Sequence, residues 1–213
     1  MKKQKKWWLT MILGALLIVG TACAPKADNQ NGKEEEKKQE TKEMSVSSTG
    51  LVDGVWQDKY GMRGTQFNEN KVPNYSIPFK IEDAPEKTKS YAIILEDKDA
   101  YTVTNGITWT HWLAANITKD EVLENESKSA TDFVQGANSW MTLEGGQQSR
   151  ELSSFYGGMA PPDKPHTYEL HVFALDKELA LDNGFTLNDL YWKMEGHILD
   201  SYTLKGSYAN EKK

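Results

Sequence analysis

Three apolar runs constrain the fold of this 213-residue chain more than any other feature. Residues 91–95 are continuously apolar, which is typical of a strand covered on both faces. Residues 109–115 form a second run rich in aromatic side chains, and residues 168–175 are largely apolar on both alternating faces. Helical patterns are few, so we predict a mainly β chain, an antiparallel β-sandwich with a few peripheral helices.

Two segments carry the start signal of a helix. Thr186 is followed three residues later by an acid, a variant of the capping box, and an apolar stripe then continues through Leu187, Leu190, Tyr191 and Met194. Gly196 fits the end of this helix. Residues 118–121 (Thr-Lys-Asp-Glu) are a second capping-box candidate, which predicts at most a short helix.

Cys23 is the only cysteine, and its position predicts where the protein is located. It follows a basic head, an apolar run over residues 7–20 and two small residues, which indicates a signal peptide over residues 1–22. A cysteine directly after the cleavage site resembles a bacterial lipobox. The run is shorter than the roughly 20 residues that span a bilayer, so a lipoprotein is favoured over an uncleaved anchor. We therefore expect lipidation at Cys23 and a lipid-anchored protein on the extracytoplasmic side of the cell membrane.

Composition divides the rest of the chain. Residues 23–50 are polar and charged and are predicted to be a disordered tether, whereas residues 51–208 form one domain and residues 209–213 a polar tail. With its only thiol lipidated the chain forms no disulfide, so the fold depends on its core. The formal net charge is -6, and removal of a leader with four lysines leaves -6 - 4 = -10. This charge argues against a nucleic-acid partner.

Several polar side chains lie beside the predicted strands and suggest a small-anion cavity. His111 lies within the second run, and His166 and Tyr168 share a face of the third. Asp97 follows the first run, and a glycine- and proline-rich loop covers residues 157–162. Imidazole and phenol groups donate hydrogen bonds, and exposed backbone N–H groups bind anions. Taken alone, His111 is more simply a buried core histidine, and His171 and His197 are interpreted as structural.

The order of these motifs resembles the phosphatidylethanolamine-binding protein family, also called the Raf kinase inhibitor-like proteins, and particularly its bacterial branch. The resemblance runs from about Asn74 to Tyr208. The matching segments are residues 76–79, 89–92, 96–100, 111–112 with Asn116, 156–162, 166–168, 174–176 and 196–199. Lys98 and Tyr101 stand where the family has prolines, which predicts a less rigid turn, and Thr167 replaces an arginine.

The resemblance implies a β-sandwich of antiparallel sheets with a few outer helices and a pocket that accepts phosphate-type groups. Carried over by position, the ligand-binding residues are Asp97, Trp109, His111, Gly158, Pro161, His166 and Tyr168.

The leading functional hypothesis is therefore a membrane-anchored binding protein for a small anionic or phosphorylated ligand, without a cofactor or metal and without enzyme activity. An alternative is an inhibitor or modulator of an extracellular or envelope protease, since the family resemblance includes protease inhibitors. A hydrolase is disfavoured because no Gly-x-Ser-x-Gly elbow is present. A metal site at His111, His166 and Asp97 lacks the short spacing typical of zinc ligands.

Overall fold

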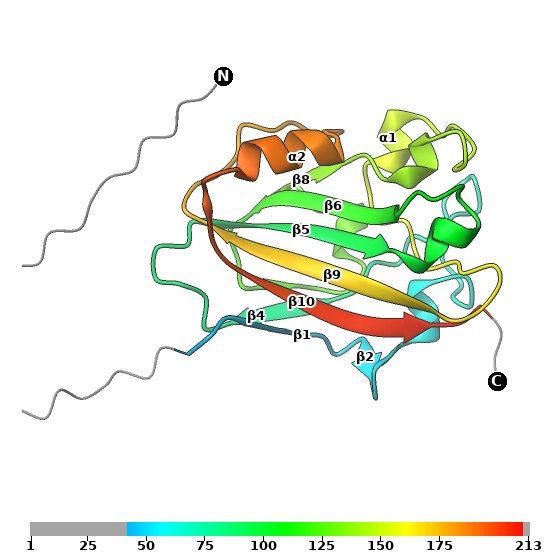
Figure 1. Cartoon of the computed structure of the whole chain (residues 1–213), viewed down its shortest axis with the longest axis horizontal. Helices are drawn as coiled ribbons and strands as arrows, with labels where there is room; N and C mark the ends of the chain where they lie inside the picture. The colour runs from blue at the N-terminus through cyan, green and yellow to red at the C-terminus, as the bar shows by residue number, and fades with distance from the viewer. Residues whose placement is uncertain (1–41, 211–213) are drawn as a thin grey trace, which may run out of the picture. The chain divides into compact units, whose positions relative to one another are not determined.

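The computed structural model describes residues 42–210, which form two sheets and a few short helices (Figure 1). The larger sheet has the order β2-β3-β10-β9-β5-β6-β8. Its strands are β2 (Leu51–Val52), β3 (Val55–Trp56), β5 (Ser90–Asp97), β6 (Trp109–Ile117), β8 (Val134–Gly136), β9 (His166–Leu175) and β10 (Ile198–Tyr208). The smaller sheet contains β1 (Ser45–Ser47), β4 (Phe79–Glu82) and β7 (Glu121–Val122) in the order β1-β4-β7.

The helices are short and lie outside the sheets. They are α1 (Arg150–Ser153), α2 (Leu187–Met194) and the 3-10 helices η1 (Asp58–Tyr60), η2 (Asp99–Thr102), η3 (Glu126–Lys128) and η4 (Ser139–Met141). No helix within residues 42–210 is long and apolar enough to cross a membrane. The predicted signal peptide, Cys23, the first part of the tether and the last three residues of the tail lie outside the described residues.

The prediction of a mainly β fold with few helices is confirmed, and the three apolar runs become the neighbouring central strands β6, β5 and β9. One detail was wrong, because the strands are not antiparallel throughout. β3 runs parallel to β10, with Val55 beside Ser207. This pairing joins a hairpin near the start of the domain to its last strand, a contact that no local sequence pattern specifies.

Two hydrophobic clusters cover the two faces of the larger sheet. On one face Leu95 and Trp112 pack in a common core with Phe79 of the smaller sheet. On the other face Leu190 and Met194 of α2 pack in a second core that includes the central strands. Because β5 lies between these cores, all eight of its residues are buried. This explains the continuous apolar run in its sequence.

The predicted helix after Thr186 is confirmed as α2, and its capping box is complete. The N–H of Asp189 donates to Thr186 Oγ1 at 3.2 Å, and the N–H of Thr186 donates to Asp189 Oδ2 at 2.9 Å. The short helix expected at residues 118–121 is wrong. Glu121 begins β7 and pairs with Lys80 of β4, so tertiary pairing overrides the local start signal.

The domain begins earlier than residue 51. Ser45–Ser47, expected to be part of the tether, is β1 and pairs with Lys80–Glu82 of β4. Met44 and Val46 are buried in the core between the sheets. Three residues between polar neighbours carry no detectable strand pattern, so the sequence alone does not reveal this strand.

The chain enters this domain at one end of the central strands. Val46 lies beside Ile81, whose N–H donates to the carbonyl oxygen of Asp120 at 2.7 Å. The Asp120 carboxylate in turn accepts a hydrogen bond from Tyr91, the second residue of β5. Asp97 lies six residues farther along β5, which is about 20 Å at the rise of an extended strand. In Figure 1 the chain enters β1 on the side of the domain where β5 starts, whereas Asp97 lies at the other end of β5.

Candidate ligand-binding pocket

A cavity of about 300 Å³ lies where β5 ends and where β6 and β9 begin. Asp97 is directly beside Trp109 on β6 and beside Tyr168 on β9, so the sheet register itself aligns these three residues. The complete lining consists of Asp97, Ala100, Val103, Thr104, Trp109, His111, Trp140, Glu144, Ala160, Pro162, His166 and Tyr168. The expectation that His111 and His166 meet in one hollow agrees with this arrangement, and their role in binding stays a prediction.

His111 reaches the pocket because of an irregularity in β6. Leu95 pairs with Trp112, but the next residue of β5, Glu96, pairs with Thr110. His111 is therefore the extra residue on β6, as in a β-bulge, which re-aims a side chain relative to the regular alternation. A strict period-two interpretation of residues 109–115 could not have predicted this.

A reciprocal pair of hydrogen bonds fixes the His111 ring. The N–H of Gly157 donates to the carbonyl oxygen of His111 at 2.9 Å, and His111 Nδ1 lies 2.8 Å from the carbonyl oxygen of Gly157. Because a carbonyl oxygen can only accept, Nδ1 carries the proton. Burial lowers the pKa of His111 and outweighs the opposing charge of Asp97. The neutral ring then leaves the lone pair of Nε2 available as an acceptor.

Aromatic rings form the walls around His111. Trp140 packs edge-on against both His111 and Trp109, with ring centroids 5.2 Å apart in each pair. Tyr168 lies on another side of His111 at 5.1 Å. A Cβ atom on Gly157 would lie 2.3 Å from the Trp140 ring, so only glycine permits this packing. The walls are thus rigid and largely apolar.

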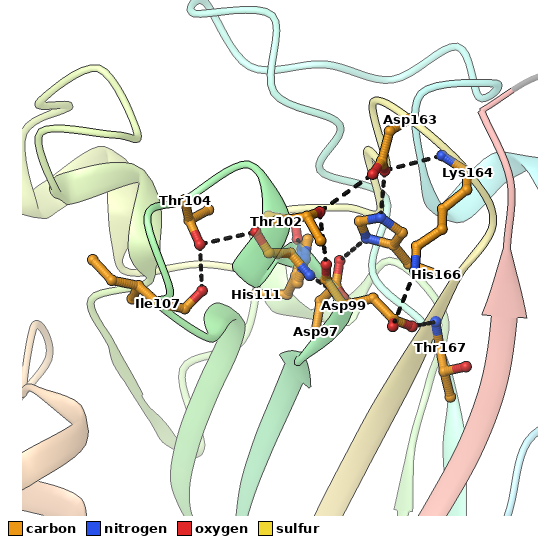
Figure 2. Close-up of polar contacts among 12 residues, drawn as sticks. Asp97, Asp99, Thr102, Thr104, Ile107, His111, Asp163, Lys164, His166 and Thr167 are labelled. Carbon is orange, nitrogen blue, oxygen red and sulfur yellow. Dashed lines mark hydrogen bonds and ion pairs between the residues drawn. The ribbon is translucent and has the colours of Figure 1, made fainter.

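His166 is held between two carboxylates (Figure 2). Its Nδ1 lies 2.7 Å from Asp97 Oδ2, and its Nε2 lies 2.7 Å from Asp163 Oδ1. Carboxylates accept hydrogen bonds, so both nitrogens donate and the ring is an imidazolium. Burial alone would lower the pKa of His166, but the hydrogen bonds to Asp97 and Asp163 outweigh it and raise the pKa. Both donors of this ring are occupied, so His166 has none left for a ligand.

The same network joins the two loops at the pocket mouth. Asp163 accepts a hydrogen bond from Thr102 of η2 at 3.2 Å. Asp99 accepts one from the backbone N–H of Thr167 at 2.9 Å and lies 3.6 Å from the Lys164 ammonium group. Figure 2 shows these contacts linking the η2 loop to the loop before β9. The mouth is therefore braced by ionic contacts.

Two buried donors in the lining make no well-formed hydrogen bond among the described residues. They are the indole Nε1 of Trp109 and the hydroxyl of Tyr168, although the Tyr168 hydroxyl has weaker contacts with Asp97 and the backbone of Ala160. Burial raises the pKa of Tyr168 far above its usual value, so its hydroxyl keeps the proton. An unpaired buried donor costs about 1–3 kcal/mol, so the pair favours a bound acceptor atom.

Gly158 and Pro161 do not line the pocket, unlike the other five predicted residues. The N–H of Gly158 donates to the carbonyl oxygen of Pro73 at 2.6 Å, and a Cβ there would lie 2.6 Å from the carbonyl oxygen of Tyr60. Gly158 therefore serves close backbone packing. Pro161 lines a separate cavity of about 210 Å³ next to Ala209.

Sequence reasoning missed several lining residues, above all Trp140 and Glu144. Trp140 lies in the three-residue helix η4 and Glu144 in the turn that follows it, and neither stretch has a periodic pattern. Ala100, Val103, Thr104, Ala160 and Pro162 also line the pocket, and each is adjacent to a predicted segment. Asp163 was missed too, although its position three residues before His166 was a usable signal.

A second charged cluster, on the face of the larger sheet that carries α2, involves Glu96, Glu169 and His171, whose ligand atoms lie within 4.8 Å of one another. The Lys98 ammonium group lies 3.1 Å from Glu96 and 2.8 Å from Glu169, and Lys205 lies 2.9 Å from Glu169. The hydrogen bonds from Lys98 and then Lys205 lower the pKa of Glu169 to about 2. Protein cations already compensate the carboxylates, so the cluster is an ion-pair network that ties down the turn at Lys98.

Comparison with known proteins gives consistent results. Residues 47–209 match a family model described as phosphatidylethanolamine-binding protein. The uncharacterized protein YxkA of Bacillus subtilis is 39% identical over 146 residues, covering 67% of this chain and 86% of the relative. A crystal structure of a putative phosphatidylethanolamine-binding protein homolog from Chlamydia trachomatis matches with a TM-score of 0.64 and 26% identity, covering 79% of this chain and 99% of that one. YbcL of E. coli, at 22% identity and a TM-score of 0.62 over 80% of this chain and all of that one, has the same fold.

Proposed function

This chain belongs to the phosphatidylethanolamine-binding protein family, and from that membership and the pocket geometry we propose that it is a binding protein for a small anionic or phosphorylated ligand. The ligand occupies the cavity at the end of β5 and is bound without being chemically changed. The protein is anchored through a lipid on Cys23 and acts on the extracytoplasmic side of the membrane. The anchor rests on the lipobox-like sequence before Cys23.

The observation that carries the proposal is a pair of buried donors without a well-formed hydrogen bond, Trp109 Nε1 and the Tyr168 hydroxyl. Both belong to the cavity lining, so a ligand oxygen there satisfies groups that are otherwise buried without such a bond. Carboxylate and phosphate oxygens are strong acceptors for such donors.

The charges around the cavity restrict which anion fits. No Lys or Arg is among its lining residues in the described part of the chain, and Asp97 and Glu144 are. The neutral His111 presents a lone pair at Nε2 and therefore pairs best with an O–H group of the ligand. A partly protonated oxyanion, such as monobasic phosphate, meets both requirements.

Isothermal titration of the full chain with phosphate, phosphoethanolamine and acetate tests the proposal. We expect Tyr168→Phe to weaken binding at least tenfold with little loss of stability, because its hydroxyl makes no well-formed hydrogen bond to the protein and only weaker contacts with Asp97 and the backbone of Ala160. Tyr156→Phe is the matched control: its hydroxyl donates to the carbonyl oxygen of Tyr60 at 2.7 Å, so it should cost about 1 kcal/mol of stability and leave binding unchanged. The absence of binding by all three anions at high concentration excludes the proposal.

Affinity should also depend on pH in a defined direction. Burial lowers the pKa of His111, so acidification below its ordinary value of about 6.5 begins to protonate it. Protonation turns Nε2 into a donor and adds a positive charge, so an acetate or phosphate monoanion should bind more tightly as the pH falls from 7 to 5. In His111→Ala this gain should disappear, and its persistence would assign the effect to another group.

The alternative, an inhibitor or modulator of an extracellular or envelope protease, stays a prediction. A pulldown from envelope extract with the Tyr168→Phe variant distinguishes it from ligand binding, because an inhibitor should retain its protease partner when the pocket is altered.

A further inference from the structure

A second cavity, larger than the pocket, lies beside β8 at the outer edge of the larger sheet. It has a volume of about 460 Å³ and shares no lining residue with the pocket. We call it the edge cavity. It is lined by Lys128, Ser129, Ala130, Thr131, Gln135, Arg150, Glu151, Ser154, Phe155, Asn183 and Gly184. Four separate segments thus contribute to one concave surface.

The floor of the edge cavity is fixed by Gln135 of β8. Its side-chain oxygen accepts hydrogen bonds from Trp112 Nε1 at 2.8 Å and from the Ser127 hydroxyl at 2.6 Å. Its backbone N–H donates to Asn183 Oδ1 at 2.8 Å, and its carbonyl oxygen accepts from the N–H of Gly184 at 2.7 Å. Gln135 is thus hydrogen-bonded through its side chain to the interior of the domain and through its backbone to the segment at residues 183–184, which fixes the floor of the cavity.

Two cations line the edge cavity and are little used by the protein. Lys128 is exposed and makes no ion pair among the described residues. Arg150 donates one hydrogen bond, from Nη1 to the carbonyl oxygen of Gly184, and its guanidinium has five N–H donors. Glu151 is the one acid in the lining, and nearby Asp189 is hydrogen-bonded to Thr186.

Neutral donors lie beside these cations. Asn183 uses its carbonyl oxygen to accept from Gln135, which leaves its NH₂ group without a partner among the described residues. Ser129 and Thr131 add hydroxyls, and the half-exposed Phe155 ring adds an apolar surface. The lining of this concave surface carries two lysine or arginine cations against one acid, in a chain with a formal net charge of -6.

We propose that the edge cavity is a second binding site, independent of the pocket, for an oxyanion ligand bearing a carboxylate or phosphate group. Arg150 presents its planar fork to two ligand oxygens, which suits bidentate recognition of either group. Lys128 contributes a mobile point charge, and the Asn183 amide binds a further oxygen. The lining of the pocket contains neither lysine nor arginine. The edge cavity should therefore accept a more negatively charged ligand than the pocket does.

Amide chemical shifts of the ¹⁵N-labelled full chain, titrated with inorganic phosphate and separately with succinate, test this proposal and distinguish the two ligand chemistries. We expect shifts at Ser129, Asn183 and Gly184, and an affinity that falls as salt is added. Lys128→Gln and Arg150→Gln should each weaken binding about tenfold, equivalent to about 1.4 kcal/mol. Lys87→Gln is the control, because Lys87 is equally exposed, makes no ion pair in the described part of the chain and lies outside the cavity.

Three results would overturn the proposal. The first is the absence of any shift with either anion, and the second is shifts confined to the pocket around His111 and Trp109. The third is an equal loss of affinity in Lys87→Gln, which would indicate unspecific charge attraction. Lys128 makes no ion pair or side-chain hydrogen bond among the described residues, so its variant should remain folded, and an unchanged melting temperature checks that a loss of binding does not come from unfolding.

Discussion

At the scale of single residues, His166 determines how the pocket wall holds together. Its ring bridges Asp97 at the end of β5 and Asp163 in the loop before β9. It is almost completely buried, with 1% of its surface exposed. Removal of the imidazolium leaves the buried Asp97 carboxylate without its cation, which typically costs about 3 kcal/mol or more.

We predict that His166→Ala destabilises the chain by about 3 kcal/mol at pH 6 and by less at pH 9. The folded pKa of His166 is raised, so its stabilising contribution is complete below the unfolded pKa of about 6.5 and is lost as the pH rises through the higher folded pKa. Urea unfolding of both proteins between pH 5 and 9 measures this difference. A difference that stays constant across this range contradicts the charged bridge.

Which site residues could be predicted also follows from physics at this scale. Asp97, Trp109, His111, His166 and Tyr168 lie on or next to apolar strands, where their order along the chain is visible. Trp140 belongs to a loop whose position depends on a ring packed over Gly157. No local pattern encodes that contact, so Trp140 could not be placed from the sequence.

At the scale of elements, the loop at residues 157–162 is a packing element more than a ligand cradle. The backbone N–H of Gly157 donates to the carbonyl oxygen of His111, and its own carbonyl oxygen accepts from the His111 ring. Gly157 also packs against the Trp140 ring, and the N–H of Gly158 donates to the carbonyl oxygen of Pro73. The resemblance implied that Gly158 and Pro161 of this loop bind the ligand, but neither lines the pocket, and the loop's glycines make backbone contacts.

We therefore predict that Gly157→Ala destabilises the chain by about 1–3 kcal/mol, as overpacking does, and weakens ligand binding at the same time. The new methyl group must displace the Trp140 ring, which lies 2.3 Å from its position. Tryptophan fluorescence and urea unfolding measure the two effects. Gly54→Ala serves as control, since no atom lies within 4 Å there and its cost of backbone strain should leave binding intact.

The capping box of α2 offers a second prediction at this scale. Thr186→Ala removes the hydroxyl that accepts from the Asp189 N–H and should cost about 1 kcal/mol. Thermal unfolding monitored by circular dichroism measures this loss, with the exposed Thr65→Ala as control. An unchanged melting temperature would mean that packing of Leu190 and Met194 alone holds the helix.

How well the elements could be predicted depended on how they are buried. β5, β6 and β9 are covered on both faces, so their sequences carry long apolar runs. β10 is eleven residues long but largely exposed or half-buried, and its mixed sequence gave no strand prediction. At residues 118–121 a real local signal lost to the pairing of β7 with β4.

At the scale of the whole molecule, the only thiol lies outside the domain, so reducing agents should not change its stability. We predict that Cys23→Ser moves the protein from the membrane fraction to the soluble fraction and abolishes incorporation of labelled fatty acid. A high-salt wash should leave the wild-type protein on the membrane, because a net charge of -10 gives no electrostatic attraction to anionic lipids. Release by salt would contradict lipid anchoring.

The distance between β1 and Asp97 has a consequence for such a protein. The chain joins the domain on the side where β5 starts, and the cavity lies where β5 ends, about 20 Å farther along that strand. In a chain anchored at Cys23, as proposed above, we therefore expect the attachment point not to block the opening of the cavity.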